Sequence, residues 1–419
     1  MRIQSRFILL TAVRWLPVGL VIPVLVLMLQ ARGLSLADVG LMLALYSVVT
    51  LLLELPTGGL ADVLGRRPVI VASSLTSLMG LVVAGLAARP VLLGLAVILL
   101  AVGRALSSGP LEAWFVDEAR AVDDSADIQP GLARAGAAEA LSLGAGAVVG
   151  GALPAAAAAL VPTLEVSGTQ PLISLSAPFL LAALVSGVHA GLVLLMVQEG
   201  RRPRTRGDVA ANIATTIRTG LTQAARGVVL RRVLLTSGAV GVVLSTLELL
   251  SPGAFAPKLG GAETGTAGYG VLVAVGFAVT AAGSLLAPRL GARLGGRGRA
   301  AALALLLAAP AALAVSAQPL PAAVTGYLVV YALLGAVGPL TSAILHDEVR
   351  EEERSTALSV QSLLLQAGGA GASVGVGVLA EQAGLTAGFA VAAAACLIGA
   401  WLMGRPRPLP ARSADVEAV

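Results

Sequence analysis

Long apolar stretches alternate with short polar segments along the whole chain. Their ends are set, to within a few residues, by charged side chains and by Gly and Pro. The stretches cover 7–30, 38–60, 68–87, 91–114, 132–160, 177–199, 232–255, 265–287, 300–317, 321–345, 356–380 and 385–403. A helix of roughly 20 apolar residues crosses the ~30 Å hydrocarbon core of a bilayer. The pattern therefore predicts an all-α membrane protein with twelve transmembrane helices.

Composition supports the same class and excludes several others. Apolar residues make up 57% of the 419 positions and charged residues only 12%, whereas soluble domains are about one quarter charged. Cys396 is the only cysteine, which excludes a disulfide framework and a thiolate metal site. The sequence contains no phosphate-binding loop and no metalloprotease motif, so it favours neither an ATP-driven pump nor an enzyme. We expect no catalytic residues, no cofactor and no metal.

Basic residues are distributed unevenly between the predicted loops. When the N-terminus is placed in the cytoplasm, most arginines fall in cytoplasmic segments, and eight of them lie between Arg201 and Arg232. This distribution predicts a multi-pass protein of the cell (inner) membrane with both termini cytoplasmic. Topology and contact with anionic lipids then explain the net charge of +5. No nucleic-acid partner is expected, because only 3% of the residues are aromatic and stacking platforms are lacking.

The second half of the chain repeats the first. Residues 144–150 read GAGAVVG and residues 369–375 read GAGASVG, and the segments 109–120 and 338–350 open and close with the same residues. We therefore divide the chain into an N-terminal six-helix half (1–199), a cytoplasmic linker (200–231), a C-terminal six-helix half (232–404) and a cytoplasmic tail (405–419). Within the linker, Val209, Ile213, Ile217 and Leu221 predict a helix, either on the inner membrane surface or as a soluble connection.

The loop between the second and third predicted helices carries the most specific motif. Its sequence, GGLADVLGRR, matches the pattern G-x-L-A-D-[RK]-x-G-R-[RK] except at Val63. That pattern is a signature of the major facilitator superfamily, and the chain resembles this family, in particular its bacterial drug:proton antiporters, from the first span to the last. The equivalent loop of the second half, 290–297, has Ala292 where Asp62 would stand. It is interpreted as a degenerate copy.

The resemblance implies a gate formed by this motif. In the family, the aspartate of the motif caps the start of the eleventh span in the outward-open state, and its arginine pairs with an acidic residue at the inner end of the fourth span. The implied gating residues here are Gly58, Asp62, Gly65, Arg66, Arg67 and Asp117. The alternative is that these charges only anchor the loops at the membrane surface. Asp347, at the matching place in the second half, is interpreted as a generic interface charge.

Four charged residues in or near the predicted spans are candidates for proton coupling, because charge within a membrane is costly to keep. They are Arg14, Glu54, Arg104 and Glu112. The surroundings of Arg104 resemble the fourth span of proton-coupled antiporters, and a structural ion pair is the alternative. Glu54 is the preferred proton site and Glu112 a comparable one, because carboxylates removed from water accept protons more readily. A carboxylate that only reaches the interface is the alternative for Glu54, and Arg14 could pair with either glutamate.

Four further residues are candidates for lining a substrate cavity, namely His189, Glu248, Tyr327 and Tyr331. Glu248 could bind a cation. An imidazole titrates near physiological pH, although His189 could equally be a packed, hydrogen-bonded histidine. Tyr327 and Tyr331 are four residues apart and share one helix face, which meets either the cavity or lipid.

Together these features favour a secondary transporter. We expect two six-helix halves that rock around a central cavity and export a small apolar or amphipathic compound in exchange for protons. The expected partners are a small-molecule substrate, protons and the lipid bilayer, and the protein is expected to be a monomer. Two alternatives stay open: a proton-coupled importer or facilitator of a metabolite, and a membrane receptor or scaffold that has kept the fold without transport.

Overall fold

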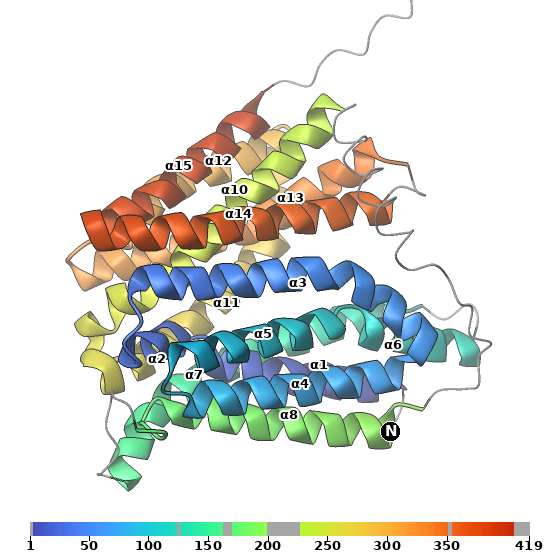
Figure 1. Cartoon of the computed structure of the whole chain (residues 1–419). Coiled ribbons are helices and arrows are strands. Elements are labelled where there is room, and N and C mark those ends of the chain that lie inside the picture. The colour runs from blue at the N-terminus through green and yellow to red at the C-terminus, as the bar shows by residue number, and fades with distance from the viewer. Residues whose placement is uncertain (1–2, 124–126, 162–169, 199–226, 351–353, 406–419) are drawn as a thin grey trace, which may run out of the picture.

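The computed structural model describes residues 3–123, 127–161, 170–198, 227–350 and 354–405, and these residues form helices joined by short connections (Figure 1). The predicted linker helix from Val209 to Leu221 and most of the tail lie outside the described residues. The helices of the first part are α1 (Ile3–Val21), α2 (Leu25–Ala31), α3 (Leu36–Leu64), α4 (Arg66–Leu86), α5 (Pro90–Leu106), α6 (Pro110–Val122), α7 (Gln129–Leu160) and α8 (Ser176–Met196). Those of the second part are α10 (Val228–Phe255), the short 3-10 helix η1 (Pro257–Leu259), α11 (Gly261–Arg293), α12 (Arg297–Ala314), α13 (Leu320–Glu348), α14 (Arg354–Ala383) and α15 (Leu385–Gly404).

The predicted membrane architecture is confirmed. Eleven spans in the described residues are long and apolar enough to cross a membrane, and the bent pair α1 and α2 makes a twelfth. The bend of 42° between α1 and α2 falls at Pro23, which cannot donate a helical hydrogen bond. The chain is therefore a multi-pass membrane protein.

The fourth span is not the continuous helix that the prediction of 91–114 implies. Helix α5 ends at Leu106, and α6 starts at Pro110 and runs on to Val122. Gly109, between them, has a φ of 91°, a conformation that glycine adopts without a steric penalty. Proline at the first position of α6 then starts a new helix. The turn 107–109 brings polar groups to the interior of the bundle, as described below.

Two helical bundles make up the molecule. Helices α1 to α8 pack mainly against one another, as do α10 to α15 (Figure 1). The two bundles meet chiefly through two helix pairs, α3 with α14 and α7 with α11. The repeated segments 144–150 and 369–375 lie on α7 and α14, one in each pair. The internal duplication thus appears in space as two related contacts between the bundles.

Glycines allow the closest approaches between these helices. A side chain at Gly40 of α3 would overlap the backbone carbonyl of Ser373 on α14. Across the other pair, a side chain at Gly270 of α11 would overlap the carbonyl of Ala147 on α7. Small residues let helix backbones come close in the membrane, where van der Waals contact is a main source of association. The tightest contacts between bundles therefore rest on residues without a side chain.

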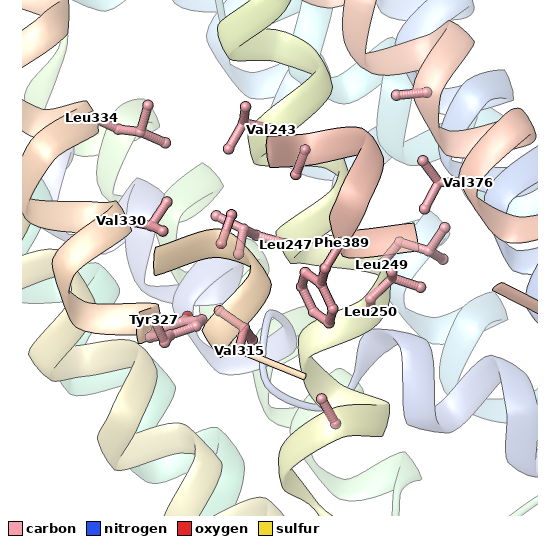
Figure 2. Close-up of a cluster of buried hydrophobic side chains, with 14 of the residues drawn as sticks. Val243, Leu247, Leu249, Leu250, Val315, Tyr327, Val330, Leu334, Val376 and Phe389 are labelled. Carbon is pink, nitrogen blue, oxygen red and sulfur yellow. The ribbon is translucent and has the colours of Figure 1, made fainter. Parts of the chain in front are cut away.

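The second bundle has a filled interior. Figure 2 shows Val243, Leu247, Val330, Leu334 and Phe389 among the buried apolar side chains that converge there from α10, α13 and α15. Such packing leaves little space between these helices. The candidate site lies instead in the first bundle.

Candidate substrate cavity

A cavity of about 220 Å³ lies within the first bundle. Side chains of α1, α2, α3, α4, α5, α6 and α8 line it, and one lining residue, Glu248 of α10, comes from the second bundle. Most of the wall is apolar, with Leu25, Met42 and Val97 as representative members. A concave, mainly apolar site with a few polar groups is the usual form of a small-molecule site.

Two arginines occupy the polar part of this wall. The Arg14 guanidinium donates a 2.8 Å hydrogen bond from Nη2 to the Ser107 hydroxyl oxygen, and that hydroxyl donates a 2.7 Å bond to the backbone carbonyl of Arg104. The indole ring of Trp15 lies near both arginines, with 5.2 Å from its centroid to Cζ of Arg14 and 5.4 Å to Cζ of Arg104. Both distances suit a cation–π contact. The arrangement holds two positive charges near one aromatic ring.

The end of α5 is held in place by its neighbours. The Ser73 hydroxyl of α4 donates a 2.7 Å hydrogen bond to the carbonyl of Gly103, and the Thr57 hydroxyl of α3 donates a 2.9 Å bond to that of Ala105. Gly103 has no side chain, so α5 can approach the backbone of Ser73 closely. These contacts flank Arg104 on both sides along the helix. They fix the position from which its guanidinium reaches the cavity.

Neither arginine forms an ion pair within the described part of the chain. Arg14 lies within Coulombic range of Glu139 on α7 and of Glu112. The Tyr46 hydroxyl lies within Coulombic range of both arginines and of Glu248. The cavity wall therefore carries two arginines against one carboxylate, and further carboxylates stand behind it.

Glu139 was not among the residues that the sequence singled out. It lies in α7 within a stretch of alanine and glycine and is partly buried beside the arginine pair. A signal was present, because Glu139 is an acidic residue inside a predicted span, and such residues are functional candidates by default.

Glu54 connects the two bundles. Its Oε2 accepts a 2.8 Å hydrogen bond from Nε2 of Gln366 on α14, and its Oε1 accepts a 3.3 Å bond from the hydroxyl of Ser108. Glu54 is thus placed between the contact of α3 with α14 and the turn that follows Arg104. Glu112, in the first turn of α6, is exposed. Neither glutamate is among the residues that line the cavity.

The four candidates for the substrate cavity are divided by the structure. Glu248 and His189 both line the cavity, and Nδ1 of His189 is hydrogen-bonded at 2.8 Å to the Ser74 hydroxyl. Tyr327 and Tyr331 do not line it. They pack at 4.6 Å between ring centroids in an aromatic cluster of the second bundle that includes Phe255. Tyr327 is only 2% exposed and packs inside its own bundle, so the lipid interpretation is wrong for it, whereas the cavity interpretation of the two tyrosines stays a prediction.

Residues of the loop motif are in contact with the end of the fourth span. Arg66 forms an ion pair with Asp117, and Arg67 donates a hydrogen bond to the backbone carbonyl of Leu194. Gly65 joins α3 to α4 with a φ of 96°, which favours glycine at that position. Gly58 lies in the last turns of α3, and the side chain of Asp62 lies outside the described residues.

A second ion pair stands at the corresponding place of the second bundle. Arg297, the first residue of α12, pairs with Asp347 near the end of α13, with 2.6 Å between Nη1 and Oδ2. Gly296, just before α12, has a positive φ of 136°, as Gly65 does before α4. The second copy has therefore kept the arginine–aspartate pair although it has lost the aspartate of the loop. Asp347, interpreted from the sequence as a generic interface charge, thus has a specific partner in Arg297.

The bundles are closed together at the end of the molecule away from Ile3 and Arg405. There the backbone N–H of Ala37, at the start of α3, donates a 3.2 Å hydrogen bond to Oε1 of Glu381, near the end of α14. Gly40 and Gly270, at which a side chain would overlap a carbonyl of the facing helix, lie in the same half of the molecule. Because a glycine contacts a backbone carbonyl closely in both helix pairs, the two bundles are packed most tightly at this end.

These features define a class: a membrane protein of two repeated six-span bundles, with a polar-lined cavity and paired helices between the bundles. The sequence model of the Major Facilitator Superfamily matches residues 7–261 and 254–418, and the chain belongs to this family. No curated protein matches the chain.

Solved structures share the fold at low sequence identity. A mutant of the nucleoside transporter NupG covers 96% of this chain and 99% of its own, with a TM-score of 0.76 and 12% identity. A bacterial homolog of the human lysosomal transporter Spinster, in an inward-facing and unoccupied conformation, has a TM-score of 0.69 and 17% identity, and the match covers 96% of this chain and 94% of that one. The human organic anion transporter MFSD10 (TETRAN) has a TM-score of 0.62 and 18% identity, and the match covers 96% of this chain and 99% of that one. At these identities the likeness establishes the fold alone.

Proposed function

We propose that the protein is a proton-coupled secondary transporter that exports a small amphipathic compound by alternating access. The observation that carries the proposal is the cavity within the membrane-spanning helices, whose apolar wall includes two arginines and a glutamate from the opposite bundle. Charged groups inside a membrane are costly, and a transport pathway is the usual reason for keeping them. The solved relatives are named as transporters of different substrates, which supports transport without pointing to one compound.

Alternating access would proceed by rocking of the two bundles. The contacts of α3 with α14 and of α7 with α11 would act as the moving surfaces. The Arg66–Asp117 pair, together with Asp62, would serve as the gate, and the Arg297–Asp347 pair would be its counterpart. With both termini in the cytoplasm of a bacterial cell, the closed end described here would face outward. We propose this orientation, in the inner membrane, for a protein that works as a monomer.

Proton coupling would use the carboxylates near the bundle boundary. When Glu54 is ionised, both of its oxygens accept hydrogen bonds, one of them from Gln366 across the boundary. Protonation would turn one oxygen into a donor and would remove the charge that strengthens these bonds. The contact of α3 with α14 would then weaken near the gate, so that one facing state is favoured over the other. Glu112 would share or replace this role.

Two alternatives compete with this proposal. An importer or facilitator has the same architecture. The direction in which protons move relative to the substrate would distinguish it from an exporter that exchanges its substrate for protons. A receptor or scaffold without transport would leave the cavity unused. Both Glu248 on the cavity wall and the Gln366–Glu54 bond between bundles favour a moving transporter over a static scaffold.

Tracer uptake into proteoliposomes tests transport itself. The probes are three tritiated naphthalene compounds that differ in charge: naphthalene-2-sulfonate, naphthalene-2-sulfonamide and 2-naphthylmethylammonium. We expect saturable uptake of at least one probe above that of protein-free vesicles. Uptake equal to that of protein-free vesicles for all three would contradict transport of a small amphipathic compound.

A further inference from the structure

We propose that the cavity selects an amphipathic organic anion, with its acidic group between Arg14 and Arg104 and its apolar body against the surrounding leucine, valine and methionine side chains. This inference rests on the proposed transport function and specifies its substrate class. Three features of the cavity support it: its charge, its shape and the placement of Glu248.

The charge of the cavity is not balanced at its wall. Arg104 makes no ion pair and no side-chain hydrogen bond in the described residues; its guanidinium lies near the Trp15 ring and within Coulombic range of Tyr46 and Glu139. Arg14 donates only to a neutral hydroxyl, that of Ser107. Two cations in a medium of low dielectric repel one another, and an anion between them strongly stabilises both charges. An incoming carboxylate, sulfonate or phosphate group would supply the missing acceptor oxygens, and the planar guanidinium matches such groups well.

The remainder of the wall suits an apolar body. Leu25, Leu29, Met42, Leu43, Leu81 and Leu100 are among its members, from four different helices. A volume of about 220 Å³ accommodates a compact group such as a bicyclic aromatic ring. Contact with apolar side chains stabilises such a group by roughly 25 cal/mol for each Å² removed from water. The ligand would therefore need both a charged and an apolar part.

Glu248 is the one acidic group on the wall, and it belongs to the second bundle. A cationic substrate would be drawn to it, which is the role considered from the sequence. Two arginines nevertheless outweigh one carboxylate on the wall itself, because Glu139 and Glu112 stand behind it, so the wall favours an anion. Because Glu248 stands on the opposite bundle, it would act as a competing counter-charge for the arginines and would oppose anion binding.

Thermal stability of the detergent-solubilised protein provides the binding test. Cys396 is the only cysteine and is fully buried, so a coumarin maleimide that fluoresces on reaction with a thiol reports unfolding. The probes are naphthalene-2-sulfonate, naphthalene-2-sulfonamide and 2-naphthylmethylammonium, titrated separately. A ligand that binds only the folded state raises the unfolding midpoint, and the stabilisation grows with the ligand concentration c as RT ln(1 + c/Kd). We expect the sulfonate alone to raise it, whereas equal or greater stabilisation by the ammonium compound would overturn the inference.

Substitutions sharpen the assignment. Arg104→Gln is expected to weaken sulfonate binding roughly 10- to 100-fold, as expected for a lost charge-assisted hydrogen bond. Arg104→Lys is expected to keep part of the affinity, and Glu248→Gln to increase it. The matched control is Arg89→Gln, an exposed arginine just before the same helix, which should leave the affinity unchanged. Equal binding by wild type and by both Arg104 variants would also overturn the inference.

Failure of this inference can be told apart from failure of the transport proposal. Sulfonate binding that depends on Arg104, without uptake of any probe into vesicles, would support the anion site and contradict transport. Uptake confined to the ammonium probe would support transport and contradict the anion site. If an Arg104 variant without ligand has an unfolding midpoint far below that of wild type, Arg14→Lys takes its place. This substitution keeps the positive charge but removes the guanidinium geometry.

Discussion

Nε2 of Gln366 in the second bundle donates a 2.8 Å hydrogen bond to the carboxylate of Glu54 in the first. This bond lies on the contact of α3 with α14, one of the two helix pairs that join the bundles. It also places a titratable group where the bundles must separate if they rock. Under the proposed coupling, protonation of Glu54 at this bond would change the contact between the two bundles.

The first prediction concerns this bond. Gln366→Leu removes the donor, and a hydrogen bond to a charged group contributes about 1.5–3 kcal/mol. We expect lower stability and altered transport, because the contact between bundles loses its polar link to Glu54. Measured quantities are the unfolding midpoint and the rate of probe uptake.

Gln361→Leu is the matched control for that prediction. Gln361 lies on the same helix, but its Nε2 donates a 3.1 Å bond to the hydroxyl of Ser237 on α10, within the second bundle. Its loss is expected to lower stability while the proton dependence of uptake stays as in wild type. If the two variants changed the proton dependence equally, the special role of the bond between bundles would be contradicted.

The second prediction compares the two arginine–aspartate pairs. The Arg66 and Asp117 side chains are 20% and 29% exposed, whereas those of Arg297 and Asp347 are 48% and 49% exposed. Exposed ion pairs contribute about 0.2–1 kcal/mol, and water weakens the more exposed pair further. Double-mutant cycles measured by the free energy of unfolding should therefore give a coupling energy near the upper end of this range for Arg66–Asp117, and a smaller coupling energy for Arg297–Asp347.

Exchanging the two charges of the Arg66–Asp117 pair tests whether the pair is needed for transport. Arg66→Asp alone places two acidic groups together and is expected to lower uptake, and the addition of Asp117→Arg should restore part of it. Restored stability without restored uptake would assign the pair an anchoring role only, which was the alternative considered from the sequence.

The third prediction concerns closure of the end away from the termini. In Gly40→Ala, the new methyl group would overlap the carbonyl of Ser373, so α3 and α14 could not approach as they do here. We expect strongly reduced uptake and a loss of stability of about 1–3 kcal/mol, as for other overpacked contacts.

Gly371→Ala on α14 is the control for closure, because a side chain at this position meets open space. Alanine is the better helix former by up to about 1 kcal/mol, so this variant should be as stable as wild type or slightly more stable. Unchanged uptake by Gly40→Ala would show that the close approach of these helices is not required for transport.

Much of the architecture could be predicted from the sequence, because long apolar runs leave little choice in a membrane. The break in the fourth span was missed although Gly109 and Pro110 marked it, since apolar residues stand on both sides of the short polar turn 107–109. Hydrophobicity alone also cannot distinguish a helix face that packs inside its own bundle from one that meets lipid, and for this reason the lipid interpretation of Tyr327 was wrong. Glu139 was passed over within α7, where its neighbours in space come from other helices.

The candidate site was predictable in its residues but not in their relations. Arg14 and Arg104 were selected separately, as costly intramembrane charges. Their common contact with Trp15 and their link through Ser107 depend on how α1 packs beside the end of α5, which no local pattern encodes. The second ion pair was overlooked for a related reason, because the loop around Arg297 had lost the aspartate by which the first copy was found.

The most direct test of proton-coupled exchange is the luminal pH of proteoliposomes that contain a trapped pH-sensitive dye. Naphthalene-2-sulfonate is added outside, with potassium and valinomycin present to compensate charge; its sulfonate stays ionised, so it does not carry protons across the lipid by itself. We predict that the lumen becomes alkaline as the sulfonate enters, and that the double variant Glu54→Gln, Glu112→Gln loses this change. Acidification of the lumen would indicate an importer, and sulfonate uptake with unchanged proton movement in the double variant would contradict the coupling proposed here.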